Sequence, residues 1–211
     1  MALNFFNWSG GKDSSLALFY ALQQGVKIDL LFTTLSEKYR RISMHGVKEE
    51  LLDAQAASIG IPLKKMFLPE NASMETYNEL YKKTLNELKE EGFETAYFGD
   101  IYLEDLRKYR EDKLADVGFK AEFPLWNIPT DKISKDFIKL GFQTKIVAIN
   151  GEKLDKSFVG RDYTKQFIDD LPEEIDVCGE NGEFHSFCFD GPIYKEKINV
   201  TTGEIIEKTY D

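Results

Sequence analysis

The chain has 211 residues, of which 42% are hydrophobic and 30% charged, and its formal net charge is −10 at pH 7. This composition is typical of a soluble protein, and the acidic balance disfavours non-specific binding to nucleic acid or to an anionic membrane. The N-terminus lacks a signal-peptide pattern, and no apolar run approaches the roughly 20 residues that span a bilayer, so we expect a cytoplasmic protein.

Strands and helices are predicted to alternate in the first half of the chain. Short apolar runs predict strands over 3–8, 28–33, 63–68 and 95–98. Amphipathic stretches predict a helix ending near Gln23 and further helices over 47–59, 74–90 and 103–117. This alternation is typical of βαβ units, so we expect an α/β fold with a parallel sheet and helices on both faces.

The second half is less regular, and we expect a smaller mixed α+β domain there. The patterns predict a helix ending at Gly141, a strand over 142–149, a helix over 161–171, and strands within 184–210 that include a hairpin turning at Thr202 and Gly203. We place a boundary near residue 120, which divides the chain into domains 1–120 and 121–211.

The first predicted strand is followed by the sequence SGGKDSS at residues 9–15. A loop in this position lies at the carboxyl edge of a parallel sheet, where ligands of such folds bind. Gly10 and Gly11 allow the backbone to approach a ligand closely, Lys12 adds a positive charge, and the next helix directs its positive end at the same place. The loop therefore suits an anion with several oxygens. It is not a Walker loop, because Phe6 and Asp13 occupy the positions that require Gly and Ser or Thr.

Two later stretches add charged side chains. GDIYLEDLRKYRE, at 99–111, starts where the fourth strand ends, so Asp100 should face the same cleft as the loop. GENGEFH, at 179–185, groups Glu180, Glu183 and His185 among glycines. Such a cluster could bind an amine or a cation or transfer a proton, or it could be a polar hairpin with a structural histidine.

Together with PLW at 124–126, these motifs resemble the diphthine–ammonia ligase (diphthamide synthetase) family of PP-loop ATP pyrophosphatases, in its short single-module form. The resemblance extends over most of the chain, and GENGEFH is its more diagnostic motif. It implies a HUP-type Rossmann-like domain followed by a smaller domain. It also implies an AMP-forming ligase that uses ATP and ammonium to amidate a carboxylate, which is diphthine on elongation factor 2 if the source makes diphthamide.

Residue roles follow from this resemblance. The nucleotide would contact the loop and the end of the second strand, at Ser9, Gly10, Gly11, Lys12, Asp13, Ser14, Ser15, Thr33 and Thr34. Asp13 either binds magnesium or aligns with the helix dipole. Acceptor binding or catalysis would involve Asp100, Arg107, Glu180, Glu183 and His185, with Arg107 on the acceptor carboxylate. His45 either borders the nucleotide or is an ordinary loop residue.

Three alternatives stay open at this point. They are a PP-loop enzyme acting on a small-molecule carboxylate, an enzyme transferring sulfur to tRNA, and a non-catalytic ATP-binding module. Sulfur transfer would need reactive cysteines, whereas Cys178 and Cys188 form no CxxC motif and are expected to be reduced, partly buried thiols. A homodimer is compatible with the sequence.

Overall fold

The computed structural model describes residues 2–42 and 45–207. The first part of the chain alternates strands and helices, in the order β1 (Leu3–Asn7), α1 (Lys12–Gln23), β2 (Leu30–Ser36), α2 (Glu49–Ile59), β3 (Leu63–Leu68), α3 (Met74–Glu90), β4 (Phe93–Tyr97), α4 (Glu104–Ala115) and β5 (Lys120–Glu122). The remainder contains α5 (Thr130–Lys139), β6 (Gln143–Ile149), the short 3-10 helix η1 (Lys156–Phe158), α6 (Lys165–Asp169) and β7 (Phe184–Asp190).

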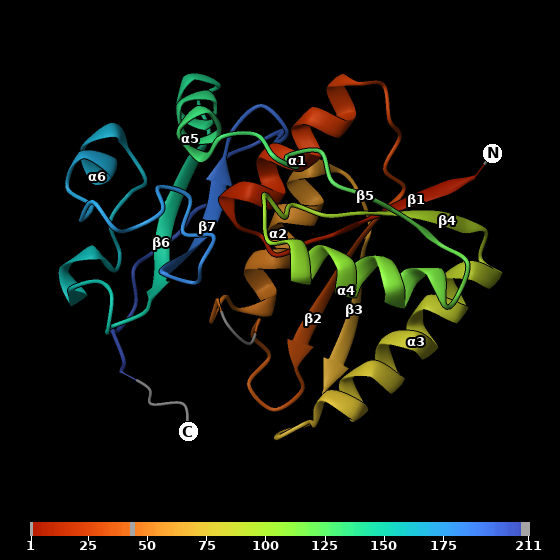
Figure 1. Ribbon diagram of the computed structural model, residues 1–211. Coiled ribbons are helices and arrows are strands. Elements are labelled where there is room, and N and C mark those ends of the chain that lie inside the picture. Colours follow the sequence, from red (N-terminus) through yellow and green to blue (C-terminus); the bar gives the residue numbers. More distant parts are fainter. Residues whose placement is uncertain (1, 43–44, 208–211) are drawn as a thin grey trace.

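The first five strands form one parallel sheet in the order β3-β2-β1-β4-β5 (Figure 1). β1 lies at the centre, and the chain moves outward from it first on one side and then on the other. The loop after β1 is therefore at the point where the strand order reverses, which is the usual ligand position in open α/β sheets. The expected α/β fold with a parallel sheet is confirmed.

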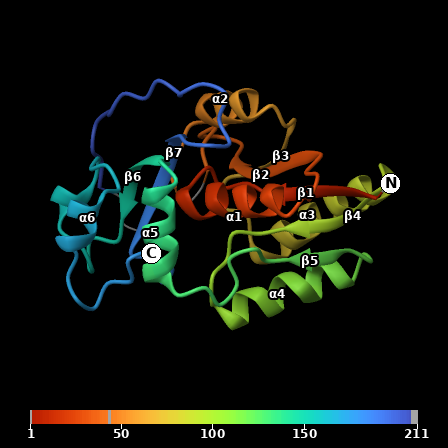
Figure 2. The ribbon, with the colours of Figure 1, turned by 90° about the horizontal axis from the view of Figure 1, so that it is seen from above.

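Helices cover both faces of the sheet, with α1 and α2 packed on one face and α3 and α4 on the other (Figure 2). Consecutive side chains of β1 point to opposite faces, so that Phe5 packs with α3 and α4 and Phe6 packs with α1 and α2. The core on the α1 and α2 face continues without interruption into the C-terminal part, which contributes Phe137, Phe167 and Phe184. One shared core thus holds the C-terminal part against the sheet.

The C-terminal part is built on the antiparallel pair β6-β7, which lies beside α1 (Figure 1). A buried amide joins it to the loop after β1. Gln55 of α2 donates from Nε2 to the carbonyl oxygens of Gly10 (2.9 Å) and Cys188 (2.6 Å), and its Oε1 accepts from Trp8 Nε1 (2.8 Å). The Cys188 amide also donates to the Gly10 carbonyl (2.8 Å). These bonds hold β7 next to the loop.

Most predicted elements are present, with three differences. The polar segment of β5 was missed because three residues give no periodicity. The helix expected over 161–171 is only Lys165–Asp169, because Asp162 instead bridges to Lys145 of β6. The hairpin at Thr202 and Gly203 is wrong: residues 191–207 form no strand, and the alternating residues after 200 are exposed instead of being paired with a neighbouring strand. Residues 208–210 of that prediction lie outside the described residues.

Among the residues that the structure describes, no helix is both long enough and apolar enough to cross a membrane.

Candidate active site

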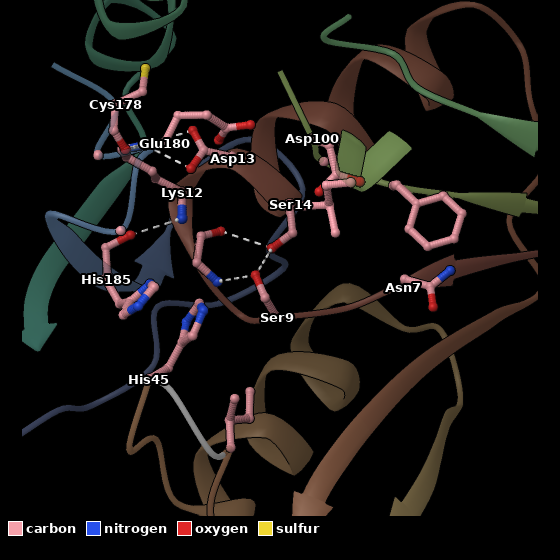
Figure 3. Close-up of a pocket in the computed structure, with 18 of the residues that line it drawn as sticks. Asn7, Ser9, Lys12, Asp13, Ser14, His45, Asp100, Cys178, Glu180 and His185 are labelled. Atoms are coloured by element: carbon pink, nitrogen blue, oxygen red, sulfur yellow. Dashed lines mark hydrogen bonds and ion pairs between the residues drawn. The ribbon is translucent and has the colours of Figure 1, made fainter. Parts of the chain in front are cut away.

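A cavity of about 520 Å³ lies where the carboxyl ends of β1, β2 and β4 meet the C-terminal part (Figure 3). Its volume falls in the range of small-molecule sites. The wall combines the loop after β1, the ends of β2, β3 and β4, helix α4, and residues 178–186. Segments more than 160 positions apart in the sequence therefore face one ligand-sized space.

The two glycines of the loop set its backbone conformation and let it pack closely against β7. Gly10 has φ +74°, a conformation that favours glycine. A Cβ on Gly11 would lie 3.1 Å from the Ser186 carbonyl oxygen, so the loop and β7 pack closely only with glycine there. The Gly11 amide donates to Ser9 Oγ (3.3 Å), and the Lys12 amide to Ser186 Oγ (3.1 Å). Both amides thus have side-chain partners, while Gly11 and Lys12, at the start of α1, line the cavity.

Lys12 connects the loop to the C-terminal part. Its side chain is buried, and its Nζ donates to both Asp13 carboxylate oxygens (2.6 and 2.7 Å) and to the Cys178 carbonyl. Burial works against the ammonium charge, but the Asp13 carboxylate outweighs it, so the pKa of Lys12 is raised. Lys12 therefore stays positively charged at the floor of the cavity.

The residues predicted to bind the nucleotide divide into those that line the cavity and those that do not. Ser9, Gly11, Lys12, Asp13, Ser14 and Thr34 line the cavity, whereas Gly10, Ser15 and Thr33 do not. Ser15 is fully buried, and its Oγ donates to the Gly11 carbonyl (2.9 Å). Thr33 points away because neighbouring side chains of a strand face opposite sides of the sheet.

Glu180 reaches from the C-terminal part to the end of β4. Its Oε1 accepts a hydrogen bond from the Ile101 amide (2.9 Å), and Figure 3 shows the side chain beside Asp13. Burial, supported by the negative charge of Asp13, raises the pKa of Glu180 to about 7. Near neutral pH this carboxyl group can therefore both lose and accept a proton.

Glu183 belongs to the same motif but does not line the cavity. It is buried within the C-terminal part, where its Oε1 accepts from Asn181 Nδ2 (3.2 Å) and lies 4.0 Å from Lys153 Nζ. Its neighbours on both sides, Gly182 and Phe184, do line the cavity. Of the two carboxyl groups in the GENGEFH motif, that of Glu180 therefore lines the cavity and that of Glu183 does not.

The two histidines of the chain stack on each other at the cavity wall. The rings of His45 and His185 lie 4.4 Å apart at an interplanar angle of 20° (Figure 3). Burial and the neighbouring His185 lower the pKa of His45 to about 3, and burial with the nearby Lys12 charge lowers that of His185. Both imidazoles are therefore neutral at physiological pH.

Two arginines of α4 differ in position. Arg107, the predicted acceptor ligand, does not line the cavity: its guanidinium lies 4.5 Å from the Trp126 ring centre, and its Nε donates to Glu111 (2.7 Å). Arg110 does line it, together with Asp100. Sequence reasoning missed Arg110, although its three-residue spacing from Arg107 on a predicted helix made it a candidate.

Cys178, the first residue of the segment 178–186, also lines the cavity, although it is 166 residues from Lys12 in the sequence. Its Sγ is directed at the Thr130 carbonyl (3.4 Å) and points away from Lys12 in Figure 3. Burial raises the pKa of this thiol to about 12 and that of Cys188 to about 11. Neither cysteine is therefore an activated thiolate.

Within the described ranges, no three His, Cys, Asp or Glu side chains are grouped so that they could hold a metal ion. Magnesium in nucleotide sites often takes only one or two protein carboxylates and completes its shell with phosphate oxygens and water. Asp13 supplies one carboxylate in the cavity wall, with its side chain 27% exposed. The loop is therefore compatible with a magnesium ion that arrives with phosphate.

The fold and the loop define an ATP-binding PP-loop protein of the Rossmann-like α/β class. Two family models match the chain: the diphthamide synthase N-terminal domain over residues 4–121 and the diphthamide synthase C-terminal domain over residues 129–210. The chain therefore belongs to the diphthamide synthase family.

Curated relatives are similar at low identity over most of the chain. Human diphthine–ammonia ligase is 22% identical over an alignment of 229 positions that covers 96% of this chain and 84% of the human protein. The protein of the same name from Danio rerio is 24% identical over 94% of this chain and 86% of its own length. The one from Schizosaccharomyces pombe is 21% identical, and the match spans 94% of this chain but 36% of that protein.

Proposed function

We propose that the protein is an ATP-dependent, AMP-forming ligase that joins ammonia to a carboxylate. The observation that carries this proposal is the meeting, in one cavity, of the SGGKDS loop and Glu180 of the GENGEFH motif. A module that only bound ATP would gain nothing from a carboxyl group with a pKa of about 7 next to the phosphate loop.

In the first half-reaction, an oxygen of the acceptor carboxylate attacks the α-phosphorus of ATP. The P–O bond to the β-phosphate breaks, pyrophosphate leaves, and an acyl-adenylate forms. Lys12 and the amides at the start of α1 hold the phosphates, because charge and dipole both favour an anion there. Magnesium, when bound, neutralises phosphate charge, and Asp13 would hold it. Thr34 would contact the nucleoside.

In the second half-reaction, Glu180 takes a proton from ammonium, and the ammonia lone pair attacks the acyl carbon. The bond from that carbon to the AMP oxygen breaks, AMP leaves, and the surplus proton on nitrogen passes to solvent. A base works best when its pKa lies near the operating pH. Glu180 meets this condition, whereas His45, with a pKa of about 3, does not. His45 and His185 would instead form an uncharged wall, and Glu183 would support the motif from within the C-terminal part.

The acceptor we propose is the diphthine carboxylate of elongation factor 2, provided that the source makes diphthamide. Sulfur transfer to tRNA is disfavoured by the raised pKa of both thiols and by the net charge of −10. A small-molecule carboxylate acceptor would use the same chemistry.

The test is product analysis with ATP, magnesium, ammonium and diphthine-bearing elongation factor 2. Formation of AMP, pyrophosphate and amidated factor in equal amounts supports the proposal. Formation of ADP would contradict it, as would an absence of turnover with this factor and with a panel of small carboxylates.

A further inference from the structure

A second, smaller cavity lies in the C-terminal part, outside the site described above. Its volume is about 230 Å³, and its wall is formed by Glu152, Lys153, Glu174, Ile175 and Glu183. This volume is much larger than the roughly 30 Å³ that one water occupies in the liquid. Three of the five side chains are carboxylates and one is an amine, so the wall has a net negative formal charge at pH 7. The cavity therefore favours a small cation.

Glu183 is the buried carboxylate of this wall, with an exposure of 2%. Its Oε1 accepts from Asn181 Nδ2 (3.2 Å) and lies 4.0 Å from Lys153 Nζ, at the upper limit for an ion pair. Its Oε2 is buried and has no hydrogen-bond partner among the described residues. A buried polar oxygen without a donor is costly, so a ligand that brings an N–H group would stabilise it.

The rest of the wall restricts the kind of cation. Glu152 and Glu174 are exposed, whereas Ile175 is 7% exposed and adds an apolar surface. The carboxylates here are not grouped as metal ligands, because no metal-holding group of three such side chains occurs in the part of the chain that the structure describes. Ammonium carries a single charge and four N–H donors, so it suits scattered carboxylates and one unpaired oxygen better than a divalent metal does.

Adjacent residues of one segment separate the two cavities. Gly182 and Phe184 line the main cavity, whereas Glu183 between them lines the smaller one. Burial and then neighbouring negative charges, those of Glu180 and Glu183 among them, raise the pKa of Tyr102. Tyr102 is therefore within electrostatic range of carboxyl groups that line the two different cavities. A cation bound at Glu183 would lie one chain segment away from the proposed base.

We propose that the smaller cavity binds ammonium, the nitrogen donor of the proposed reaction, and holds it beside the main cavity. Oε2 of Glu183 accepts a hydrogen bond from the ammonium, while Glu152 and Glu174 attract the cation to the mouth of the cavity. Lys153 competes with ammonium, because its side chain is a tethered amine next to the same carboxylate. This inference rests on the proposed function, since it assigns a site to one of the substrates of that reaction.

The test measures binding, so it needs no turnover. The probes are ammonium chloride and tetramethylammonium chloride, which have the same charge but differ in N–H donors. They are titrated at constant ionic strength and followed by the backbone amide NMR shifts of residues 150–154 and 173–184. The variants are E183Q and K153M. E173Q is the matched control, because Glu173 is exposed and next to Glu174 but lines neither cavity.

We expect wild type and E173Q to bind ammonium at least about 10-fold more tightly than tetramethylammonium, because charge-assisted hydrogen bonds form with ammonium alone. E183Q should lose this preference. K153M should bind ammonium about 3-fold more tightly, since it removes a competing positive charge, and a purely structural Glu183 would not produce this gain. If E183Q does not fold, E152Q/E174Q changes exposed positions and should weaken ammonium binding. Equal binding of the two probes to wild type, no shifts with ammonium, or unchanged binding in E183Q or in E152Q/E174Q would overturn the proposal.

The ammonium dependence of turnover separates this proposal from the broader one. In E183Q the KM for ammonium should rise about 10-fold, while the KM for ATP stays within about 3-fold of wild type. An equal rise in both would indicate a structural role and refute the ammonium site. If the protein makes no amide but binds ammonium with this pattern among the variants, the ligase proposal fails while the site stands. Amide formation with an unchanged ammonium KM in E183Q would refute the site and leave the ligase proposal intact.

Discussion

The loop at residues 9–15 and the segment at residues 178–186 form facing walls of one cavity, but they obtain their chemistry in different ways. In the proposed reaction the loop acts through Lys12 and the start of α1, and all of it comes from seven consecutive residues. In the same proposal the segment acts through Glu180, whose pKa is raised by burial and by Asp13 from the other wall. We therefore propose that one wall binds phosphate and the other moves a proton.

The largest effect is expected for Glu180→Gln, which removes the proposed base. Amide formation should fall by roughly 10²- to 10⁴-fold, while a single turnover of pyrophosphate release persists. In wild type the rate should rise with pH through about 7, since Glu180 must lose its proton, and the variant should lack this inflection. Rapid-quench measurements between pH 5.5 and 8.5 test this, with the exposed Glu173→Gln as control. An inflection retained in the variant would assign the base to another group.

The same pKa has a consequence for stability that does not depend on turnover. The folded-state pKa of Glu180 lies near 7, above the ordinary value of 4.5, so the unfolded chain ionises first as pH rises. Folding stability from this group is therefore present below pH 4.5 and lost as pH rises to about 7. As pH rises across this range, the melting temperature of wild type should decline more steeply than that of Glu180→Gln. Parallel curves would contradict the raised pKa.

Lys12→Met tests the other wall while keeping most of the buried side-chain volume. ATP affinity should fall by about 100-fold, because charge-assisted hydrogen bonds to phosphate are lost. Calorimetry with ATP and magnesium measures this, and Lys27→Met, at an exposed position, is the control. If Lys12→Met kept its ATP affinity while Glu180→Gln lost it, the roles of the two walls would have to be exchanged.

Gln55→Leu tests how the two walls are held together. Trp8 Nε1 and the carbonyls of Gly10 and Cys188 would lose a buried partner, although the Gly10 carbonyl keeps its bond from the Cys188 amide. Unfolding free energy should fall by roughly 2–4 kcal/mol, since an orphaned buried polar group costs about 1–3 kcal/mol. Urea denaturation measures this against the exposed Gln23→Leu. A change below about 1 kcal/mol would show that the network adds little.

The smallest effect is expected for Cys178→Ser combined with Cys188→Ala. Burial raises the pKa of both thiols, so neither contributes a thiolate, and turnover should stay within a few-fold of wild type. Circular dichroism establishes that the variant folds. Loss of turnover in a folded variant would favour sulfur chemistry.

The strands and helices of the sheet domain could be predicted from the sequence because their patterns are local. The β3 bounds at 63–68 and the α3 bounds at 74–90 agree with the prediction. Strands that form only by pairing with a distant strand were harder to predict from the sequence. The missed β5 is a strand only because it pairs with β4, and the hairpin predicted near Thr202 has alternation but no strand beside it among the described residues.

The sequence by itself determined the phosphate loop, because glycine conformation, a lysine and a helix start are properties of consecutive residues. Only the tertiary structure decided which side chains join it. The strand pattern places Thr33 and Thr34 on opposite faces, but packing of the whole sheet determines that Thr34 faces the cavity. Likewise Arg107 stacks on Trp126, from beyond β5, while Arg110 pairs with Asp100. Charge and burial at a site depend on residues far apart in the chain, so local patterns could not specify them.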